Sequence, residues 1–233
     1  YRWQEVLSAQ LLGGFRTVYI RSRYSFEKYA RHNKNAILSH DLALNIDNVS
    51  RAKTDDIFLL GFTIRNWLAP SAQKELEEGF ADAIVRFYEK TKCTILPIIQ
   101  VVGIDDDRKP TQRVIDILRT RSVPVLEAKS LGDLDSAIQV YSTLDMILGM
   151  RMHSNVIAAT QGVPFVAVSY EYKTEGIAQS LGMHPYCIKC DYVTGGNLFL
   201  LLESVYSKRV DIASHMLNSV RDARVELVKH FNP

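Results

Sequence analysis

Apolar residues in the middle of the chain follow two alternating patterns. Short, nearly continuous apolar runs such as "IFLLGFTI" are typical of strands that are covered on both faces. Between them lie stretches in which apolar residues recur every three or four positions, as in a helix with one buried face. This alternation indicates right-handed βαβ crossovers and an α/β fold with a Rossmann-like parallel sheet. The pattern predicts strands at 57–64, 94–102, 123–128, 146–150 and 164–170, and helices at 71–92, 110–121, 130–142 and 153–161.

The flanking regions carry weaker forms of the same signals. "RTVYIRS" and "AILSHD" have the composition of strands, and we expect a helix at 24–33 between them, with Ser25 as its N-cap. An opening helix, a last strand at 186–190 and two amphipathic C-terminal helices complete the expected elements. The polar stretch 45–56 is the candidate domain boundary. We therefore expect a remnant of an N-terminal Rossmann-like domain (1–50), a C-terminal Rossmann-like domain (51–193) and C-terminal helices (194–233).

Two further helix starts are predicted from capping residues. Ser71 follows Pro70 and is the expected cap of the helix at 71–92. Ser130 and Asp133 have the spacing of a capping box, with Asp in place of Glu.

Composition and charge narrow the classes of partner. Lys and Arg number 28 against 26 Asp and Glu, a balance that argues against nucleic acid or an anionic membrane as a general electrostatic partner. The longest apolar stretches fall well short of the roughly 20 residues of a membrane-spanning helix, so we expect neither a transmembrane segment nor a signal peptide. Cys187 and Cys190 lack the second pair that a zinc site needs. We expect reduced thiols, no metal and a cytoplasmic protein.

Four polar residues follow predicted strands, at the edge where open parallel sheets bind ligands. They are Arg21, Arg65, Arg151 and His153. The helix that begins near His153 presents free N–H groups to an anion at this edge, and guanidinium groups add bidentate hydrogen bonds. The imidazole of His153 suits a general acid. Lys173, after "SYEY", is a candidate phosphate contact.

Plainer interpretations stand beside these. Arg21 and Arg65 alone are ordinary salt-bridge partners, His153 alone is a residue at the start of a helix, and Lys173 is a loop residue. The stretch 105–107, three aspartates, resembles a metal site but is more typical of a solvated turn and helix start. The sequence has no glycine-rich phosphate loop, Walker pattern or G-x-S-x-G motif. Nothing therefore indicates a dinucleotide or other cofactor.

The segment "DMILGMRMHSNVIAATQGVPFVAVSYEYKTEGIAQSLGM", residues 145–183, resembles the signature region of the polysaccharide pyruvyl transferases. That signature is an apolar strand, G-x-R-[LM]-H, an Ala-rich helix, G-V-P, a second apolar strand and Tyr-x-x-Lys. "YIRSRYSFEKY", "HDLAL" and "GFTIRNW" are weaker similarities elsewhere in the chain. Ser22 replaces the usual Asp after the arginine of the first of these, and the glycine-rich turn of the family's N-terminal domain has no counterpart.

The resemblance implies a two-domain, glycosyltransferase-B-like architecture, with the N-terminal domain incomplete in this chain. It also implies transfer of the enolpyruvyl unit of phosphoenolpyruvate to two hydroxyls of a sugar, in a cell-surface polysaccharide or its precursor. A pyruvate ketal forms and phosphate is released. By the same resemblance Arg151 and His153 are catalytic, and Arg21, Arg65 and Lys173 bind substrate. The acceptor is a sugar or a lipid-linked glycan, which brings the protein to the inner membrane face without stable insertion.

Two other functions remain open from the sequence. The first is a nucleotide-sugar-dependent glycosyltransferase, because a helix N-terminus beside a histidine also suits a nucleotide diphosphate. The second is a non-catalytic carbohydrate-binding remnant.

Overall fold

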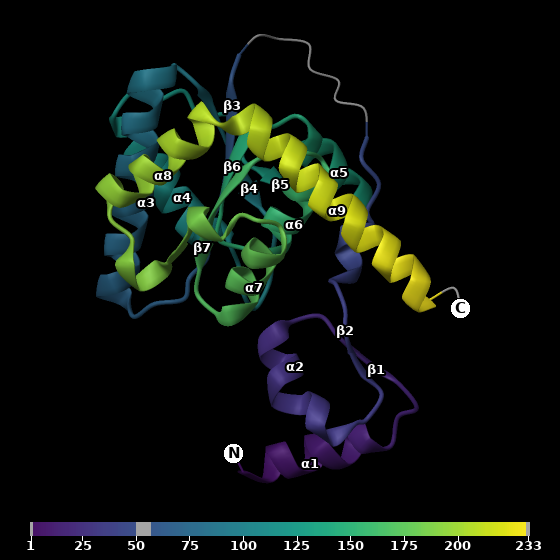
Figure 1. Cartoon of the computed structure of the whole chain (residues 1–233). Helices are drawn as coiled ribbons and strands as arrows, with labels where there is room; N and C mark the ends of the chain where they lie inside the picture. Colours follow the sequence, from purple (N-terminus) through teal and green to yellow (C-terminus); the bar gives the residue numbers. More distant parts are fainter. Residues whose placement is uncertain (1, 50–56, 232–233) are drawn as a thin grey trace.

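The computed structural model describes residues 2–49 and 57–231 (Figure 1). Residues 50–56, in the polar stretch expected to separate two domains, lie outside the described residues, and the three-part division of the chain stays a prediction.

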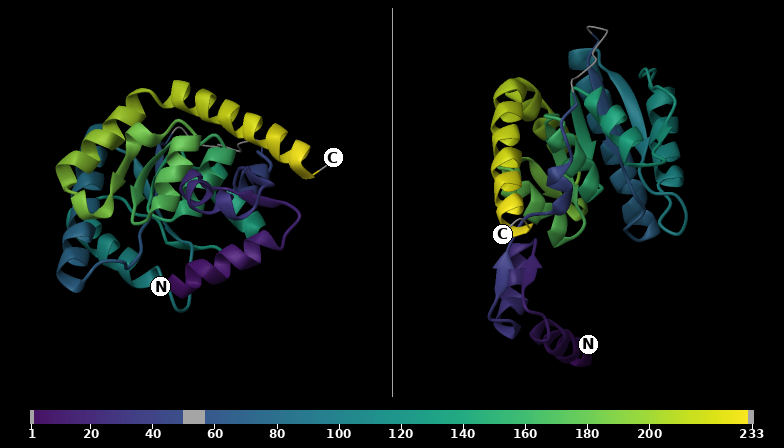
Figure 2. Two further views of the ribbon diagram at one scale, coloured as in Figure 1. Left: turned by 60° about the horizontal axis from the view of Figure 1, so that its bottom comes forward. Right: turned by 90° about the vertical axis from the view of Figure 1, so that its right-hand side faces the viewer.

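A six-stranded, all-parallel sheet forms the centre of the molecule. Its apolar runs are buried on both faces, because helices cover both sides of the sheet (Figure 2). The predicted α/β, Rossmann-like fold is therefore confirmed. In spatial order the strands are β5 (Lys129–Ser130), β4 (Thr94–Ile99), β3 (Leu59–Thr63), β6 (Met146–Gly149), β7 (Phe165–Ser169) and β8 (Cys187–Lys189).

The helices between these strands follow the predicted pattern. They are α3 (Pro70–Thr91), α4 (Arg108–Thr120), α5 (Leu134–Ser142), α6 (Met152–Thr160) and α7 (Tyr172–Ser180), and they are followed by α8 (Gly195–Ser207) and α9 (Arg209–Phe231). Residues Phe80, Ile84 and Phe87 of the long helix α3 are fully buried, as their spacing requires. Helix α8 packs along α3, and α9 runs past α6 toward the N-terminal part of the chain (Figure 1).

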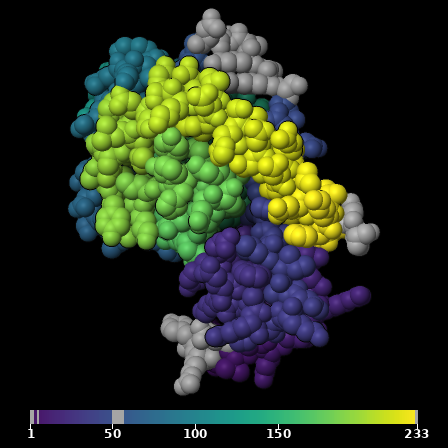
Figure 3. Space-filling model, in the orientation of Figure 1, coloured from purple at the N-terminus to yellow at the C-terminus, as the bar shows by residue number. Residues whose placement is uncertain are grey.

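Residues 2–45, called here the N-terminal segment, form a small unit beside the main sheet (Figures 1 and 3). Its two strands pair in parallel, and their carboxyl ends lie toward the main body. Its elements are α1 (Arg2–Gly13), β1 (Val18–Ile20), α2 (Arg23–Tyr29), η1 (Ala30–His32), β2 (Ala36–Leu38) and η2 (Leu42–Asn45). After α7, two short 3-10 turns flank β8; they are η3 (His184–Tyr186) and η4 (Cys190–Tyr192).

Helix α9 joins the N-terminal segment to the main body. His40 Nε2 lies 2.8 Å from Glu226 Oε2. Arg224 Nε donates to the carbonyl of Leu44 at 2.8 Å, and its Nη2 donates to the carbonyl of Ile46. These contacts hold the two strand ends of the N-terminal segment near the carboxyl edge of the main sheet.

Three local predictions were wrong. Helix α2 is capped by Ser22, whose hydroxyl accepts the N–H of Ser25 at 3.1 Å, so Ser25 lies inside the helix. Helix α3 begins at Pro70 and its N-cap Ala69 offers no side-chain acceptor, so Ser71 is not a cap. The capping box of α5 pairs Asp133 with Ser136 rather than with Ser130.

The strand predicted at 123–128 is only partly present. Val125 forms a single bridge to Ile95, and the regular strand β5 comes later, at Lys129–Ser130. Pro124 accepts the N–H of Ile95 through its carbonyl but has no N–H of its own to donate, which limits regular pairing there.

None of the described helices combines the length and the apolar character that crossing a bilayer requires. The three cysteines are free thiols, of which Cys93 and Cys190 are buried.

Candidate functional site

The turn between β6 and α6 is fixed tightly by its own residues. A Cβ on Gly149 would lie 2.0 Å from the side-chain oxygen of Asn155, so only glycine fits there. The Asn155 amide donates to the Gly149 carbonyl at 3.1 Å. Thr63 Oγ1, at the end of β3, accepts the N–H of Met150 at 3.1 Å. The glycine of the G-x-R-x-H pattern therefore lets α6 start close to the sheet edge.

Arg151 is held in a buried ion pair at this edge. Its Nη2 lies 2.7 Å from Asp107 Oδ1, its Nε donates to both oxygens of the same carboxylate, and its Nη2 also donates to the Asp105 carbonyl at 2.6 Å. Asp107 is fully buried at the N-cap of α4. Burial raises the pKa of the Asp107 carboxyl, and the hydrogen bonds from Arg151 oppose that rise. Asp107 therefore lies at a helix start, as expected, but it is buried, so the expectation that it is solvated was wrong.

Arg65 occupies a similar position one strand away. Its Nη2 lies 2.9 Å from Asp105 Oδ2, and its guanidinium lies 5.0 Å from the ring centre of Trp67 and 4.4 Å from that of Tyr170. Only 7% of Arg65 is exposed. Arg151 Nη1 approaches the same Asp105 oxygen at 3.9 Å. Arg65 and Arg151 therefore form one cluster in which protein carboxylates balance their charges.

His153 belongs to a second group at the same edge, with Arg21 and Asp41. His153 is exposed, but the surrounding chain partly desolvates it, and that lowers its pKa below the usual value. The negative charge of Asp41 opposes this shift and the positive charge of Arg21 adds to it. Both charges belong to the N-terminal segment and lie near enough to act on the imidazole, so His153 is on the side of the main body that faces this segment.

The arginine of this second group is oriented by the buried Asp41. The Asp41 carboxylate accepts from Arg21 Nη1 and caps η2 by accepting the N–H of Ala43 at 3.0 Å. The Arg21 side chain remains 42% exposed. Lys173 lies apart from both groups, 3.3 Å from Glu171, with its side chain 41% exposed. Four of the five predicted residues thus divide into two groups at this edge, and Lys173 belongs to neither.

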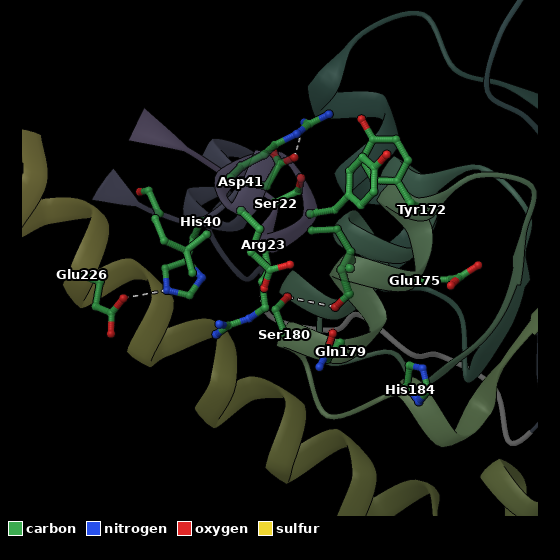
Figure 4. Close-up of a pocket in the computed structure, with 17 residues that line it drawn as sticks. Ser22, Arg23, His40, Asp41, Tyr172, Glu175, Gln179, Ser180, His184 and Glu226 are labelled. Atoms are coloured by element: carbon green, nitrogen blue, oxygen red, sulfur yellow. Dashed lines mark hydrogen bonds and ion pairs between the residues drawn. The ribbon is translucent and has the colours of Figure 1, made fainter. Parts of the chain in front are cut away.

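A pocket of about 650 Å³ lies beside Arg21, between α2 and α7, and is called here the α2–α7 pocket (Figure 4). The described residues that line it include Arg21 but not Arg65, Arg151, His153 or Lys173. Its other walls come from the end of β2, from α7, and from Glu226 of α9. Sequence reasoning missed this pocket, because its walls are about 150 residues apart along the chain.

The chemistry available at this edge is acid–base and electrostatic. His153 can exchange a proton, Arg21 offers an exposed guanidinium, and the first N–H groups of α6 face the same side. Within residues 2–49 and 57–231, no cluster of three or more His, Cys, Asp or Glu side chains could hold a metal ion.

Residues 1–172 match the family model described as polysaccharide pyruvyl transferase. The amylovoran biosynthesis protein AmsJ of Erwinia amylovora is 23% identical over 157 residues, which are 66% of this chain and 37% of AmsJ. The chain therefore spans well under half the length of that relative.

Solved structures share the fold at low sequence identity. TarM has a TM-score of 0.58 at 11% identity, over 100% of this chain and 46% of that chain. A Listeria monocytogenes protein described as a UDP-N-acetylglucosamine 2-epimerase has a TM-score of 0.61 at 10% identity, over 96% of this chain and 62% of that chain. These likenesses show a Rossmann-like, glycosyltransferase-B-like architecture.

Proposed function

The chain belongs to the polysaccharide pyruvyl transferase family, a family of transferases in polysaccharide biosynthesis, and we propose that it transfers the enolpyruvyl unit of phosphoenolpyruvate. The acceptor is a pair of hydroxyls on one sugar of a cell-surface polysaccharide or its precursor. The products are a cyclic pyruvate ketal and phosphate. Where that acceptor is attached to a lipid carrier, the protein works at the cytoplasmic face of the membrane.

One observation supports this proposal: His153, at the start of α6, lies near enough to Arg21 of the N-terminal segment for the arginine charge to lower its pKa. Phosphoenolpyruvate carries a carboxylate and a phosphate on three carbons, so its site needs fixed positive groups close together. An exposed guanidinium and free helix N–H groups supply them, and a neutral imidazole beside them gains a proton more readily once the anion binds.

The reaction balances with one proton donor. His153 protonates the methylene carbon, and the resulting cation at the central carbon is captured by the first sugar hydroxyl, which loses its proton. The bond from the central carbon to the phosphate oxygen then breaks, and the second hydroxyl closes the ketal. One of the two released protons restores the imidazolium, and the other leaves with phosphate. No step requires an oxidant or a reductant.

The other predicted residues differ in how they can act. Arg21 has a partly exposed side chain, so we assign it direct contact with the donor anion. Lys173 is also partly exposed but is paired with Glu171, and its role in binding substrate stays a prediction. Arg65 and Arg151 are engaged by Asp105 and Asp107. We assign these two the shape of the turn that presents His153.

The proposal is tested by incubating the protein with phosphoenolpyruvate and a galactoside, and measuring free phosphate and the ketal. His153→Ala should lower the rate by about 10²–10⁴-fold, the usual contribution of a general acid. Because the pKa of His153 lies below its ordinary value, kcat/KM of the unaltered protein should rise as pH falls toward that pKa. The variant should lack this rise.

His215→Ala, an exposed histidine on α9, is the matched control and should retain the full rate. Phosphate release that is equal in His153→Ala and His215→Ala would remove His153 from its role. Thermal stabilisation by a nucleotide sugar, with none from phosphoenolpyruvate, would favour a glycosyltransferase instead.

A further inference from the structure

The α2–α7 pocket differs in charge from the edge where His153 lies. Two guanidinium groups, those of Arg21 and Arg23, line it. The lining carboxylates outnumber them; they are Glu27, Asp41, Glu175 and Glu226. A pocket with an excess of carboxylates repels an anionic ligand, so a phosphorylated or carboxylated sugar is disfavoured inside it.

Several polar groups of this pocket are available to a ligand. Within the part of the chain that the structure describes, neither Glu27 nor Gln179 has a hydrogen-bond partner for its side chain, whereas Glu226 is engaged by His40 and Glu175 by Ser169. A carboxylate accepts and an amide both donates and accepts, which matches the hydroxyl groups of a sugar. The volume of about 650 Å³ lies in the usual range for small-ligand pockets, about 300–1,000 Å³.

Two tyrosine rings add an apolar surface to the pocket. Tyr24 of α2 and Tyr172 of α7 lie with ring centres 4.5 Å apart, and each retains substantial exposure, 56% and 41%. Figure 4 shows Tyr172 among the side chains that line the pocket. Exposed aromatic rings combine an apolar face with a polar hydroxyl, so they can pack on the C–H face of a sugar ring.

We propose that the α2–α7 pocket binds the acceptor as a neutral, polyhydroxylated sugar residue, and that the acidic lining excludes sugar acids and phosphates from it. The proposal rests on the proposed function, because Arg21 and Asp41 line the pocket and their charges also act on the pKa of His153. A sugar in the pocket therefore has its hydroxyls next to the donor site. The donor anion and the neutral acceptor occupy adjacent places of opposite electrostatic character.

Gly176 allows the pocket to be filled without disturbing its walls. It lies inside α7 and lines the pocket, and a Cβ added to it would meet no atom within 4 Å. Gly176→Leu should thus keep the helix while its side chain occupies ligand space. Gly132→Leu, at an equally open glycine outside the pocket, is the matched control. Tyr172→Ala and Tyr192→Ala form a second such pair of exposed tyrosines.

Binding is measured by saturation-transfer NMR with the methyl glycosides of galactose, glucose and mannose, in the absence of phosphoenolpyruvate. At least one should bind the unaltered protein, and Gly176→Leu and Tyr172→Ala should weaken that binding at least tenfold. The two controls should bind as the unaltered protein does. The uronic acid analogue of the same glycoside should bind at least tenfold more weakly. Thermal stabilisation by phosphoenolpyruvate should persist in Gly176→Leu.

Failure of all three glycosides to bind would overturn the proposal, as would unchanged binding in Gly176→Leu or tighter binding of the uronic acid. Because the sugar assay contains no phosphoenolpyruvate, a protein that binds sugar in the pocket but releases no phosphate would contradict only the proposed function.

Discussion

At the scale of single residues, the buried ion pair of Arg151 with Asp107 affects stability at the same edge of the sheet where activity is proposed. Both residues are buried, and Asp107 occupies the N-cap position of α4 without a side-chain capping hydrogen bond. Removing Arg151 leaves the Asp107 carboxylate buried without a cation, and removing Asp107 leaves Arg151 with only the more distant Asp105 carboxylate. A loss of activity in an Arg151 variant therefore does not by itself identify a catalytic role.

We expect Asp107→Ala to lower the free energy of unfolding by about 3–5 kcal/mol, because the buried Arg151 guanidinium loses its hydrogen-bonded carboxylate and keeps only Asp105 at 3.9 Å. The double variant Asp107→Leu/Arg151→Met replaces the pair with apolar groups and should cost much less. Urea denaturation measures both values. A loss below about 1 kcal/mol in Asp107→Ala would mean that the pair does not stabilise the fold.

Which residues lie at the sheet edge could be predicted from the sequence, but not their partners. Arg65, Arg151 and His153 follow apolar runs, and parallel strands bring their carboxyl ends to one edge. The ion pairs to Asp105 and Asp107 depend on how the loop after β4 folds back, which no local pattern specifies.

At the scale of elements, two adjacent glycines open α8 where it approaches α3. A Cβ on Gly195 would lie 2.0 Å from Asp82 Oδ2 and 2.6 Å from its Cβ, whereas at Gly196 the nearest atom is 4.0 Å away. On the other helix, a Cβ on Gly79 would lie 3.2 Å from a methyl group of Val193. The two helices therefore pack closely only because these positions lack side chains.

Gly195→Ala should destabilise the protein by about 1–3 kcal/mol, the usual cost of overpacking, because Asp82 or the start of α8 must move. Gly196→Ala, one residue later, should be neutral or slightly stabilising because alanine is the better helix former. Thermal unfolding compares the two variants under one condition. Equal melting temperatures would mean that the approach of α8 to α3 adapts without cost.

The existence and type of most elements could be predicted, but their ends could not. Apolar spacing identified α3 through its buried residues, and burial on both faces accounts for the apolar runs of β6 and β7. Helix starts depend on which of several nearby serines or aspartates reaches a free N–H group. Ser22 rather than Ser25, and Asp133 with Ser136 rather than Ser130, show that this choice is made by backbone geometry.

At the scale of the whole molecule, α9 determines how the two walls of the α2–α7 pocket meet. The N-terminal segment contributes only two three-residue strands, too few to be stable alone. Its position depends on contacts such as those of Arg224 with the Leu44 and Ile46 carbonyls. The pocket could not be predicted from the sequence, because it exists only once these distant segments are joined.

Arg224→Ala should increase hydrogen exchange in residues 36–46, because the carbonyls of Leu44 and Ile46 lose their donor. Exchange in β3, β6 and β7 of the main sheet should stay unchanged. Arg221→Ala, an exposed arginine on the same helix with its side chain 72% exposed, is the control. Equal exchange in the two variants would show that other contacts hold the segment.

The junction held by α9 has a consequence for ligand affinity. A sugar that contacts both α2 and α7 bridges the N-terminal segment and the main body, as Arg224 and Glu226 do. Sugar binding and the docking of the N-terminal segment onto the main body are therefore thermodynamically coupled. Docking of the segment raises the affinity for the sugar, and the bound sugar favours docking by the same factor. Affinity for the sugar is then adjustable through Arg224, which does not line the pocket.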